Sequence, residues 1–324
     1  MHSVKKTLAA GLMAAITVQT SWAAESPTVI EFVRPLGMGG AFTALSDDKN
    51  AFTYNPAGMV QRTGGEVTIF EIVAGGSEDL KEAYEFIDEN NDELTDFDTL
   101  PAPEQVRLAN EIQNKIARLR PHAYFGADVA SYVSGPLFKG VHLGFGLMGL
   151  ADARFRLYNG AVAPLIDYSI NSDVLLPVSL AKRWNAPLVP GKIGVGVTGK
   201  YIKRSQVSES RLSVFELDDI EVPPMTEGSA IGSDLGFLYQ PSGRWNVGLM
   251  VRDFLGTKMK FDAREAEDGF AAKESRDTVI RPRTNIGVSV VPKSYFGLGH
   301  TSDRLTLSAD VRDIFGKDTH VLFQ

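Results

Sequence analysis

Residues 192–201 read KIGVGVTGKY, where Ile193, Val195, Val197 and Tyr201 alternate with lysine, glycine and threonine residues. The apolar residues would lie on one face of a β-strand and the intervening residues on the other face. The same two-residue period returns at 122–134, 245–252 and 305–312. The pattern therefore predicts an all-β chain whose strands each have one apolar and one polar face.

The gaps between the predicted strands differ in length, counted from a first strand at Glu66. The short gaps are 134–139, 185–192 and 241–244, the long gaps are 75–119, 205–228 and 257–277, a medium gap is 158–165, and a moderate gap is 292–304. Outer-membrane barrels have short periplasmic turns and longer extracellular loops, unlike Greek-key sandwiches. The gaps favour a transmembrane antiparallel up-and-down β-barrel with lipid outside and a polar lumen. A soluble periplasmic β protein is the alternative.

The first residues have the features of a secretory signal peptide, which we predict to span residues 1–24. Lys5 and Lys6 precede an apolar stretch at 8–18, and Ser21-Trp22-Ala23 is a small-x-small cleavage site. The apolar stretch is too short for a membrane-spanning helix. The mature chain is therefore predicted to be exported and to lie in the cell outer membrane of a Gram-negative bacterium, in contact with membrane lipid.

Composition and motifs exclude several classes of function. The chain has no cysteine, which removes disulfides, thiolate metal sites and cysteine nucleophiles. Its net charge of -7 argues against nucleic acid as a partner. Neither a G-x-S-x-G nor an H-E-x-x-H motif occurs in the sequence. We therefore expect a protein that is not an enzyme and that has no cofactor and no metal.

A segment of different character precedes the strands and reads, over residues 31–62, EFVRPLGMGGAFTALSDDKNAFTYNPAGMVQR. Gly37, Gly39 and Gly40 permit tight turns, and further turn residues follow at 47–48 and 55–58. The glycines do not form a nucleotide-binding fingerprint, because neither a third glycine nor a lysine follows at the required spacing. The segment is predicted to be compact and not to form a strand.

This segment resembles the N-terminal signature of the FadL-like outer-membrane superfamily. That superfamily contains long-chain fatty-acid and hydrocarbon channels, PorV-like secretion-associated proteins and TraF-like conjugation-associated proteins. The residues that carry the resemblance are Arg34, Gly37, Gly39, Gly40, Asp47, Asp48, Asn55, Pro56 and Ala57.

The resemblance implies a hatch at residues 25–63, which is a plug folded inside the barrel, and a barrel at 64–324. Asn55, Pro56 and Ala57 would then lie in the lumen. The superfamily's transporters have about 14 strands, whereas about ten strands can be counted here. We therefore expect the barrel to be incomplete at the C-terminus.

An insert at 77–120 interrupts the first long gap. Leu80, Tyr84 and Ile87 predict one helix, and a second apolar run from Val106 to Leu119 predicts another. The acidic stretch between them, 85–98, lacks the glycine and the glutamate that a calcium loop requires, so a solvated loop is the simpler interpretation. The alternation of gaps places this helical insert outside the cell, over the mouth of the barrel.

Two functions follow from the resemblance as expectations. The first is an outer-membrane channel for passive uptake of hydrophobic small molecules, such as fatty acids or hydrocarbons. Lys200 and Arg252 face the lumen and could meet the carboxylate of such a ligand, although a structural role opposite Asp128, Asp234 or Asp310 is the alternative. The second is a non-transporting scaffold or partner protein of a secretion or conjugation system, which would bind a secretion-system protein.

Overall fold

The computed structural model describes residues 32–76, 85, 89, 99–118, 123–138, 140–159, 164–186, 188–213, 224–266, 270–292, 305–315 and 320–323. The predicted signal peptide, residues 1–24, lies outside the described residues. The same holds for the first helical run of the insert, for most of the acidic stretch 85–98 and for the loop at 214–223.

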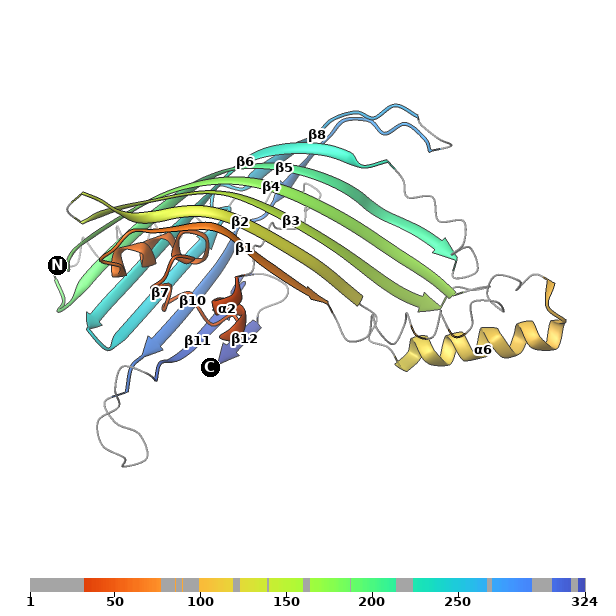
Figure 1. Cartoon of the computed structure of the whole chain (residues 1–324), viewed down its shortest axis with the longest axis horizontal. Coiled ribbons are helices and arrows are strands. Elements are labelled where there is room, and N and C mark those ends of the chain that lie inside the picture. Colours follow the sequence, from red (N-terminus) through yellow and green to blue (C-terminus); the bar gives the residue numbers. More distant parts are fainter. Residues whose placement is uncertain are drawn as a thin grey trace.

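The described strands form one antiparallel sheet of 12 strands, in which neighbours along the path follow chain order (Figure 1). The strands are β1 Glu66–Gly76, β2 Ala123–Phe138, β3 Val141–Asn159, β4 Pro164–Asn185, β5 Lys192–Ser213, β6 Thr226–Ser242, β7 Trp245–Arg252, β8 Thr257–Phe261, β9 Arg276–Ile280, β10 Arg283–Val290, β11 Leu307–Arg312 and β12 His320–Phe323. The all-β, up-and-down arrangement predicted from the alternation is therefore present.

β7 and β8 follow one another along the sheet as one interrupted strand, and so do β9 and β10. Each of these two pairs is counted as one passage of the chain across the sheet. β7 pairs with the C-terminal half of β6, Leu235–Ser242, and β8 continues past a turn to pair with β6 at Gly228–Ala230. β9 and β10 likewise follow one another, separated only by Arg281 and Pro282. The 12 strands thus make ten passages. The predicted bounds of the loop at 257–277 were wrong at both ends, because β8 and β9 include residues 257–261 and 276–277 and pair as a hairpin.

One predicted connection of medium length also differs in the structure. Two residues join β2 to β3 and two join β6 to β7, as expected for short turns. On the opposite side, however, β3 ends at Asn159 and β4 begins at Pro164, so only four residues connect them. The expected gap at 158–165 is shorter because both strands run on as a paired hairpin as far as these two residues.

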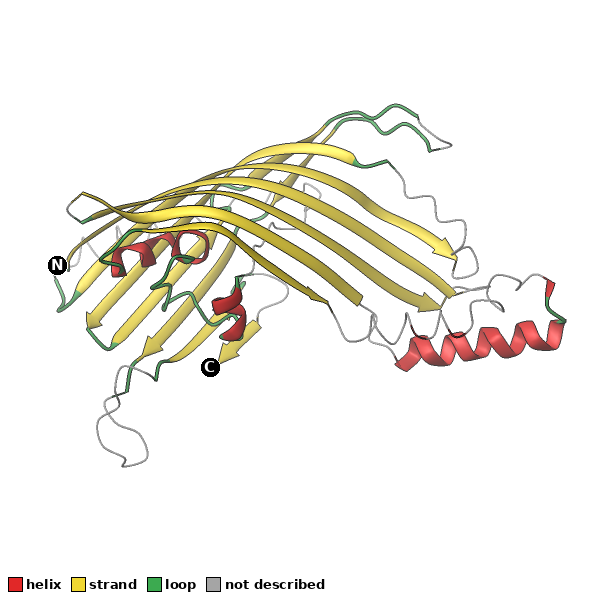
Figure 2. Cartoon of the chain, in the orientation of Figure 1, coloured by secondary structure: helices red, strands yellow, loops and turns green. Residues whose placement is uncertain are grey.

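The sheet is a curved trough and is not closed into a barrel within the described residues. Closure requires the first and last strands to pair, but β1 pairs only with β2 and β12 pairs only with β11 among the described strands. The prediction of a closed barrel is therefore not met in this part of the chain. In Figure 2 the long strands arch over the short helices of residues 33–61.

The helices are short or lie apart from the trough. α2 (Val33–Gly37), α3 (Ala51–Tyr54) and the 3-10 helix η1 (Pro56–Gln61) lie on the concave side of the sheet. The longer α6 (Ala102–Arg118) lies within the expected insert 77–120. None of the described helices combines the length and the apolar character that crossing a membrane would need.

The two faces of the sheet differ as the alternation predicted. On β5 the apolar Val197 and Tyr201 are 46% and 43% exposed on the convex side, whereas Thr198 and Lys200, which face the concave side, are 3% and 7% exposed. The buried core lies between the concave face and the N-terminal helices, and it includes Phe32, Phe42, Phe52, Tyr54, Met59, Tyr132 and Met148. The sheet therefore buries its polar face and exposes its apolar face.

Candidate functional site

The candidate site is the concave face of the sheet together with the chain segment that fills it. This segment comprises residues 32–62 and is called the inner segment below. α3 and η1 lie under the arch of the strands (Figure 1). Phe42, Phe52, Ala57 and Val60 are fully buried.

Glycines of the strands allow the inner segment to approach the sheet backbone closely. A Cβ atom added at Gly196 on β5, Gly236 on β6 or Gly248 on β7 would lie less than 3.0 Å from atoms of the inner segment. Real Cβ atoms essentially never come so close. Only glycine fits at such positions.

The Asn-Pro-Ala triplet lies at the centre of this contact. The side-chain amide of Asn55 donates hydrogen bonds to the carbonyl oxygens of Thr43 (2.8 Å) and Phe237 (3.3 Å), and its Oδ1 accepts one from the N–H of Ala57. Asn55 thereby caps η1, while Pro56 occupies the first turn of that helix. The resemblance placed this triplet inside the barrel, and the structure buries it against the concave face.

One end of the inner segment is bound to β11, near the last edge of the sheet. The carboxylate of Asp310 accepts hydrogen bonds from the backbone N–H groups of Phe42 (3.0 Å) and Thr43 (2.8 Å). The Ser308 hydroxyl donates to the carbonyl of Ala41, and Arg312 donates to the carbonyl of Gly40. Charge-assisted bonds to buried N–H groups are among the stronger hydrogen bonds in proteins.

The same segment is also bound to β1 and β2, at the first edge. Glu71 forms a 2.9 Å ion pair with Lys49 and accepts a hydrogen bond from the N–H of Val33. Tyr132 on β2 donates to Asn50 (2.8 Å), and the ammonium of Lys49 lies 5.8 Å from the centre of the Tyr132 ring. The inner segment therefore connects the two edges of an otherwise open sheet.

Bonds to the middle strands complete the attachment. The hydroxyls of Ser179 on β4 and Thr198 on β5 each lie 3.2 Å from the carbonyl oxygen of Phe52. The imidazole of His142 on β3 is 3.0 Å from the carbonyl oxygen of Arg62. These three side chains contact backbone carbonyl oxygens of the inner segment.

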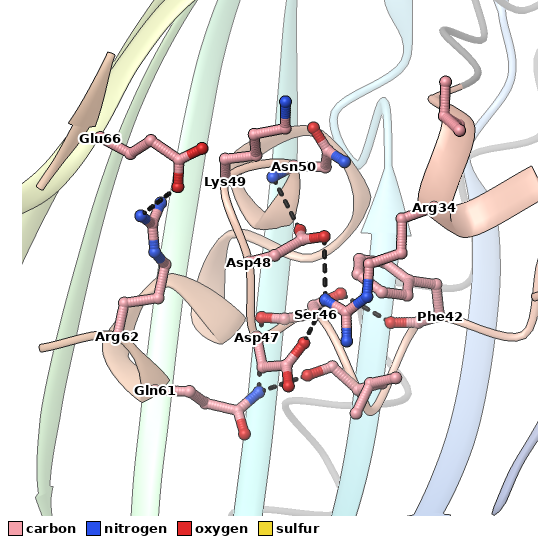
Figure 3. Close-up of polar contacts among 12 residues, drawn as sticks. Arg34, Phe42, Ser46, Asp47, Asp48, Lys49, Asn50, Gln61, Arg62 and Glu66 are labelled. Atoms are coloured by element: carbon pink, nitrogen blue, oxygen red, sulfur yellow. Dashed lines mark hydrogen bonds and ion pairs between the residues drawn. The ribbon is translucent and has the colours of Figure 1, made fainter. Parts of the chain in front are cut away.

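Arg34 closes a corner within the inner segment (Figure 3). Its guanidinium lies 2.6 Å from Asp47 and 2.9 Å from Asp48. Partial burial lowers the pKa of Arg34, but the hydrogen bonds to Asp47 and Asp48 outweigh it and raise the pKa above the ordinary value.

The glycines of the signature differ in what requires them. Gly39 and Gly40 have φ values of 54° and 80°, a region that favours glycine, whereas a Cβ at Gly37 would meet nothing within 4 Å. The signature residues thus belong to one compact structure.

The two lumen-facing cations are both engaged by the protein. The ammonium of Lys200 lies 2.8 Å from Asp234 and 2.9 Å from Asp253, and all three side chains are buried. The guanidinium of Arg252 lies 5.6 Å from the ring centre of Tyr54, which is a cation–π contact. Asp234 was one of the three expected structural partners of these cations. Asp310 instead holds the inner segment.

A small hollow adjoins these cations, with a volume of about 30 Å³. It is lined by Thr53, Leu175, Pro177, Thr198, Lys200, Asp234 and Arg252. Sites for drug-sized ligands measure roughly 300–1,000 Å³, so this hollow accepts about two water molecules and no fatty acid. Among the described residues no cluster of three His, Asp or Glu side chains could hold a metal ion.

The sequence pattern did not identify several residues that hold the site together. Glu71, Asp310 and the Arg204–Asp173 pair, which is bidentate with distances of 2.7 and 2.6 Å, carry no motif. For the glycines that contact the inner segment, the sequence did contain a recognisable pattern. Gly194 and Gly196 share a strand face, as do Gly144 and Gly146, and a face that repeats glycine predicts a close neighbour there.

Comparison with known proteins gives one finding for this region. Residues 172–311 match the family described as F plasmid transfer operon, TraF, protein. The matched stretch begins inside β4, ends inside β11 and covers less than half of the chain. It contains Lys200, Asp234, Gly196 and Asp310. Neither the curated proteins nor the solved structures include a significant match.

Proposed function

We propose that this chain is a non-transporting outer-membrane scaffold of a conjugation apparatus. The observation that carries the proposal is the match of residues 172–311 to the F plasmid transfer TraF family. The partner would be another protein of the same apparatus. The proposal assigns no catalytic step, cofactor or metal to the chain.

The exposed convex face supports a membrane location. Soluble monomers rarely expose large contiguous apolar surfaces, yet β1, β2 and the strands that follow present Val67, Ile69, Phe70, Ile72, Val129 and Val133 on the outside. Lipid is an environment in which such an apolar face is stable. The signal peptide expected at residues 1–24 would deliver the chain to that membrane.

The filled concave face favours a scaffold over a channel. The inner segment is bound to β1, β2 and β11, and its residues Phe42, Phe52, Ala57 and Val60 are fully buried. The hollow beside Lys200, about 30 Å³, has room for water but not for a fatty acid. A scaffold needs only a stable fold and exposed loops.

Passive uptake of hydrophobic molecules remains the second proposal, because the inner segment resembles the N-terminal signature of the FadL-like superfamily. The two proposals make opposite predictions for a donor strain that lacks the gene. A scaffold predicts that plasmid transfer falls at least tenfold while fatty-acid and hydrocarbon uptake is unchanged. A channel predicts the reverse.

The test compares the deletion strain with the same strain carrying the wild-type gene on a plasmid. Mating frequency and uptake of a labelled long-chain fatty acid are measured in parallel in both strains. Crosslinking followed by purification of the tagged chain then identifies the neighbouring protein. Normal transfer in the deletion strain would contradict the scaffold proposal.

A further inference from the structure

The apolar convex face ends at two rows of residues that cross neighbouring strands. One row, near the short turns, consists of the register partners Trp184, Ile193, Tyr239 and Val247 on β4 to β7. The other row consists of the register partners Val174, Lys203, Ser229 and Lys260 on β4, β5, β6 and β8. These are called the aromatic row and the lysine row below.

On β4, β5 and β6 the convex side chains between the two rows are almost all apolar, whereas on β8 Lys258 is exposed on the same face as Lys260. The apolar side chains are Leu176, Val178 and Leu180 on β4, Val195, Val197 and Tyr201 on β5, and Ile231, Leu235 and Phe237 on β6. Ile231 is 80% exposed. The polar exceptions on these three strands are Ser233 and Lys182, and Lys182 directly precedes the aromatic row, where its long side chain can reach the membrane surface.

The height of this band equals the length that a strand needs to cross a bilayer. Counted inclusively, the two rows enclose 11 residues on β4 (174–184), on β5 (193–203) and on β6 (229–239). A tilted transmembrane strand requires about 9–11 residues. Because the register is continuous, the band has the same height on all three strands.

Each border has the chemistry of a membrane–water interface. Trp184 and Trp245, at the short turns, are 42% and 51% exposed on the convex side, and tryptophan and tyrosine are enriched where lipid headgroups begin. At the opposite border Lys203 forms a 2.9 Å ion pair with Glu227, and both side chains are more than half exposed. An exposed ion pair is stable in water and would be costly within lipid.

β4 and β5 continue well beyond the lysine row. Pro164–Asp173 and Arg204–Ser213 remain paired over this length, which at about 3.3 Å per residue adds roughly 30 Å of sheet. The buried Arg204–Asp173 pair lies at the base of this extension. The extension is therefore a paired part of the sheet that the apolar band does not include.

We propose that a lipid bilayer surrounds the sheet between the aromatic row and the lysine row, and that the paired ends of β4 and β5 project from it into water. This inference rests on the membrane location in the proposed function and specifies the lipid-contacting surface. The lysine row marks the side of the long connections. The projecting ends of β4 and β5 are then the parts of the sheet that a partner protein can reach.

Single cysteines test the position of the bilayer, because the chain contains none of its own. Val197→Cys and Leu235→Cys lie within the band, whereas Lys203→Cys and Glu227→Cys lie at the lysine-row border. Each variant is spin-labelled in phosphatidylcholine–phosphatidylglycerol vesicles, and the accessibility of the label to oxygen is compared with that to a water-soluble nickel chelate. We expect the oxygen-to-nickel ratio to be several-fold higher at Val197 and Leu235 than at Lys203 and Glu227.

Native fluorescence provides a second measurement without substitution. Trp22 lies in the predicted signal peptide, so the mature chain would retain only Trp184 and Trp245, both at the aromatic border. Lipids brominated near the headgroup should quench their emission more strongly than lipids brominated near the bilayer centre.

Equal accessibility ratios at the four labelled sites, or stronger quenching from the centre, would overturn the inference. Both measurements use purified protein, so they stay informative if plasmid transfer does not depend on the gene.

Discussion

The carboxylate of Asp310 lies 2.8 Å from the backbone nitrogen of Thr43, although 267 residues separate them in the chain. The same oxygen accepts a second hydrogen bond from the N–H of Phe42. One side chain of β11 therefore satisfies two buried backbone groups at the start of the inner segment. Together with Glu71 on β1, it makes the inner segment a bridge between the two edges of the sheet.

Replacement of Asp310 by alanine should release this end of the inner segment. Each buried N–H group that loses its acceptor costs about 1–3 kcal/mol, so the free energy of unfolding in detergent micelles should fall by several kcal/mol. Asp310→Asn keeps an acceptor oxygen and should retain more of the stability. Equal losses for the two variants would show that the hydrogen bonds to Phe42 and Thr43 are not the cause.

A side chain at Gly196 should prevent the inner segment from docking. A Cβ at this position meets the backbone of Pro56 and Ala57, whereas a Cβ at Gly199, on the convex face of the same strand, meets nothing within 4 Å. Gly196→Val is expected to make the inner segment sensitive to protease, while Gly199→Val leaves it protected. Limited proteolysis of both variants followed by mass spectrometry measures the difference.

Lys200 and Lys203 provide a matched comparison of buried and exposed ion pairs. Lys200→Met leaves Asp234 and Asp253 buried without their cation, and loss of one partner of a buried pair costs about 3–5 kcal/mol. Lys203→Met removes only an exposed pair with Glu227, which water replaces. Urea unfolding followed by tryptophan fluorescence should separate the two variants clearly. If Lys200→Met is as stable as the wild type, Lys200 is free for a ligand role.

Asn55 should be the least replaceable residue of its triplet. Asn55→Ala removes the cap of η1 and the bonds to Thr43 and Phe237, with an expected loss of about 2–4 kcal/mol from the cap and the unpaired carbonyls. Asn55→Asp keeps the cap oxygen but not the donor, so its stability should be intermediate. Samples of each variant are heated to a series of temperatures and run on gels without boiling, which separate folded from unfolded protein and rank the unfolding temperatures. An alanine variant that is as stable as the aspartate variant would contradict this ranking.

Local periodicity predicted much of the fold. The alternation at 192–201 correctly assigned Val197 to the exposed face and Thr198 to the buried face, because a strand has a fixed period of two. The bend between β7 and β8 was not predictable in this way. It depends on Asp253, whose φ is 50°, and on the ion pair between Lys200 and Asp253, which joins residues far apart in sequence.

The candidate site was only partly predictable for the same reason. Asn55, Pro56 and Ala57 stand together in the chain and form a recognisable motif. Asp310 and Glu71 have no distinctive neighbours, and their importance arises only when the curved sheet brings them to the inner segment. Lys200 was identified as inward-facing, but its two carboxylate partners come from β6 and from the turn after β7.

The sequence separation between Phe42 and Asp310, which is 268 residues, has a consequence for the order of folding. Contacts between distant parts of a chain form slowly, because a long loop must close before any bond rewards it. Residues 40–43 leave the ribosome early, yet their acceptor on β11 becomes available only after almost the whole sheet has been synthesised. Closure of this contact is therefore expected to be a late step in folding, after most strands of the sheet have paired.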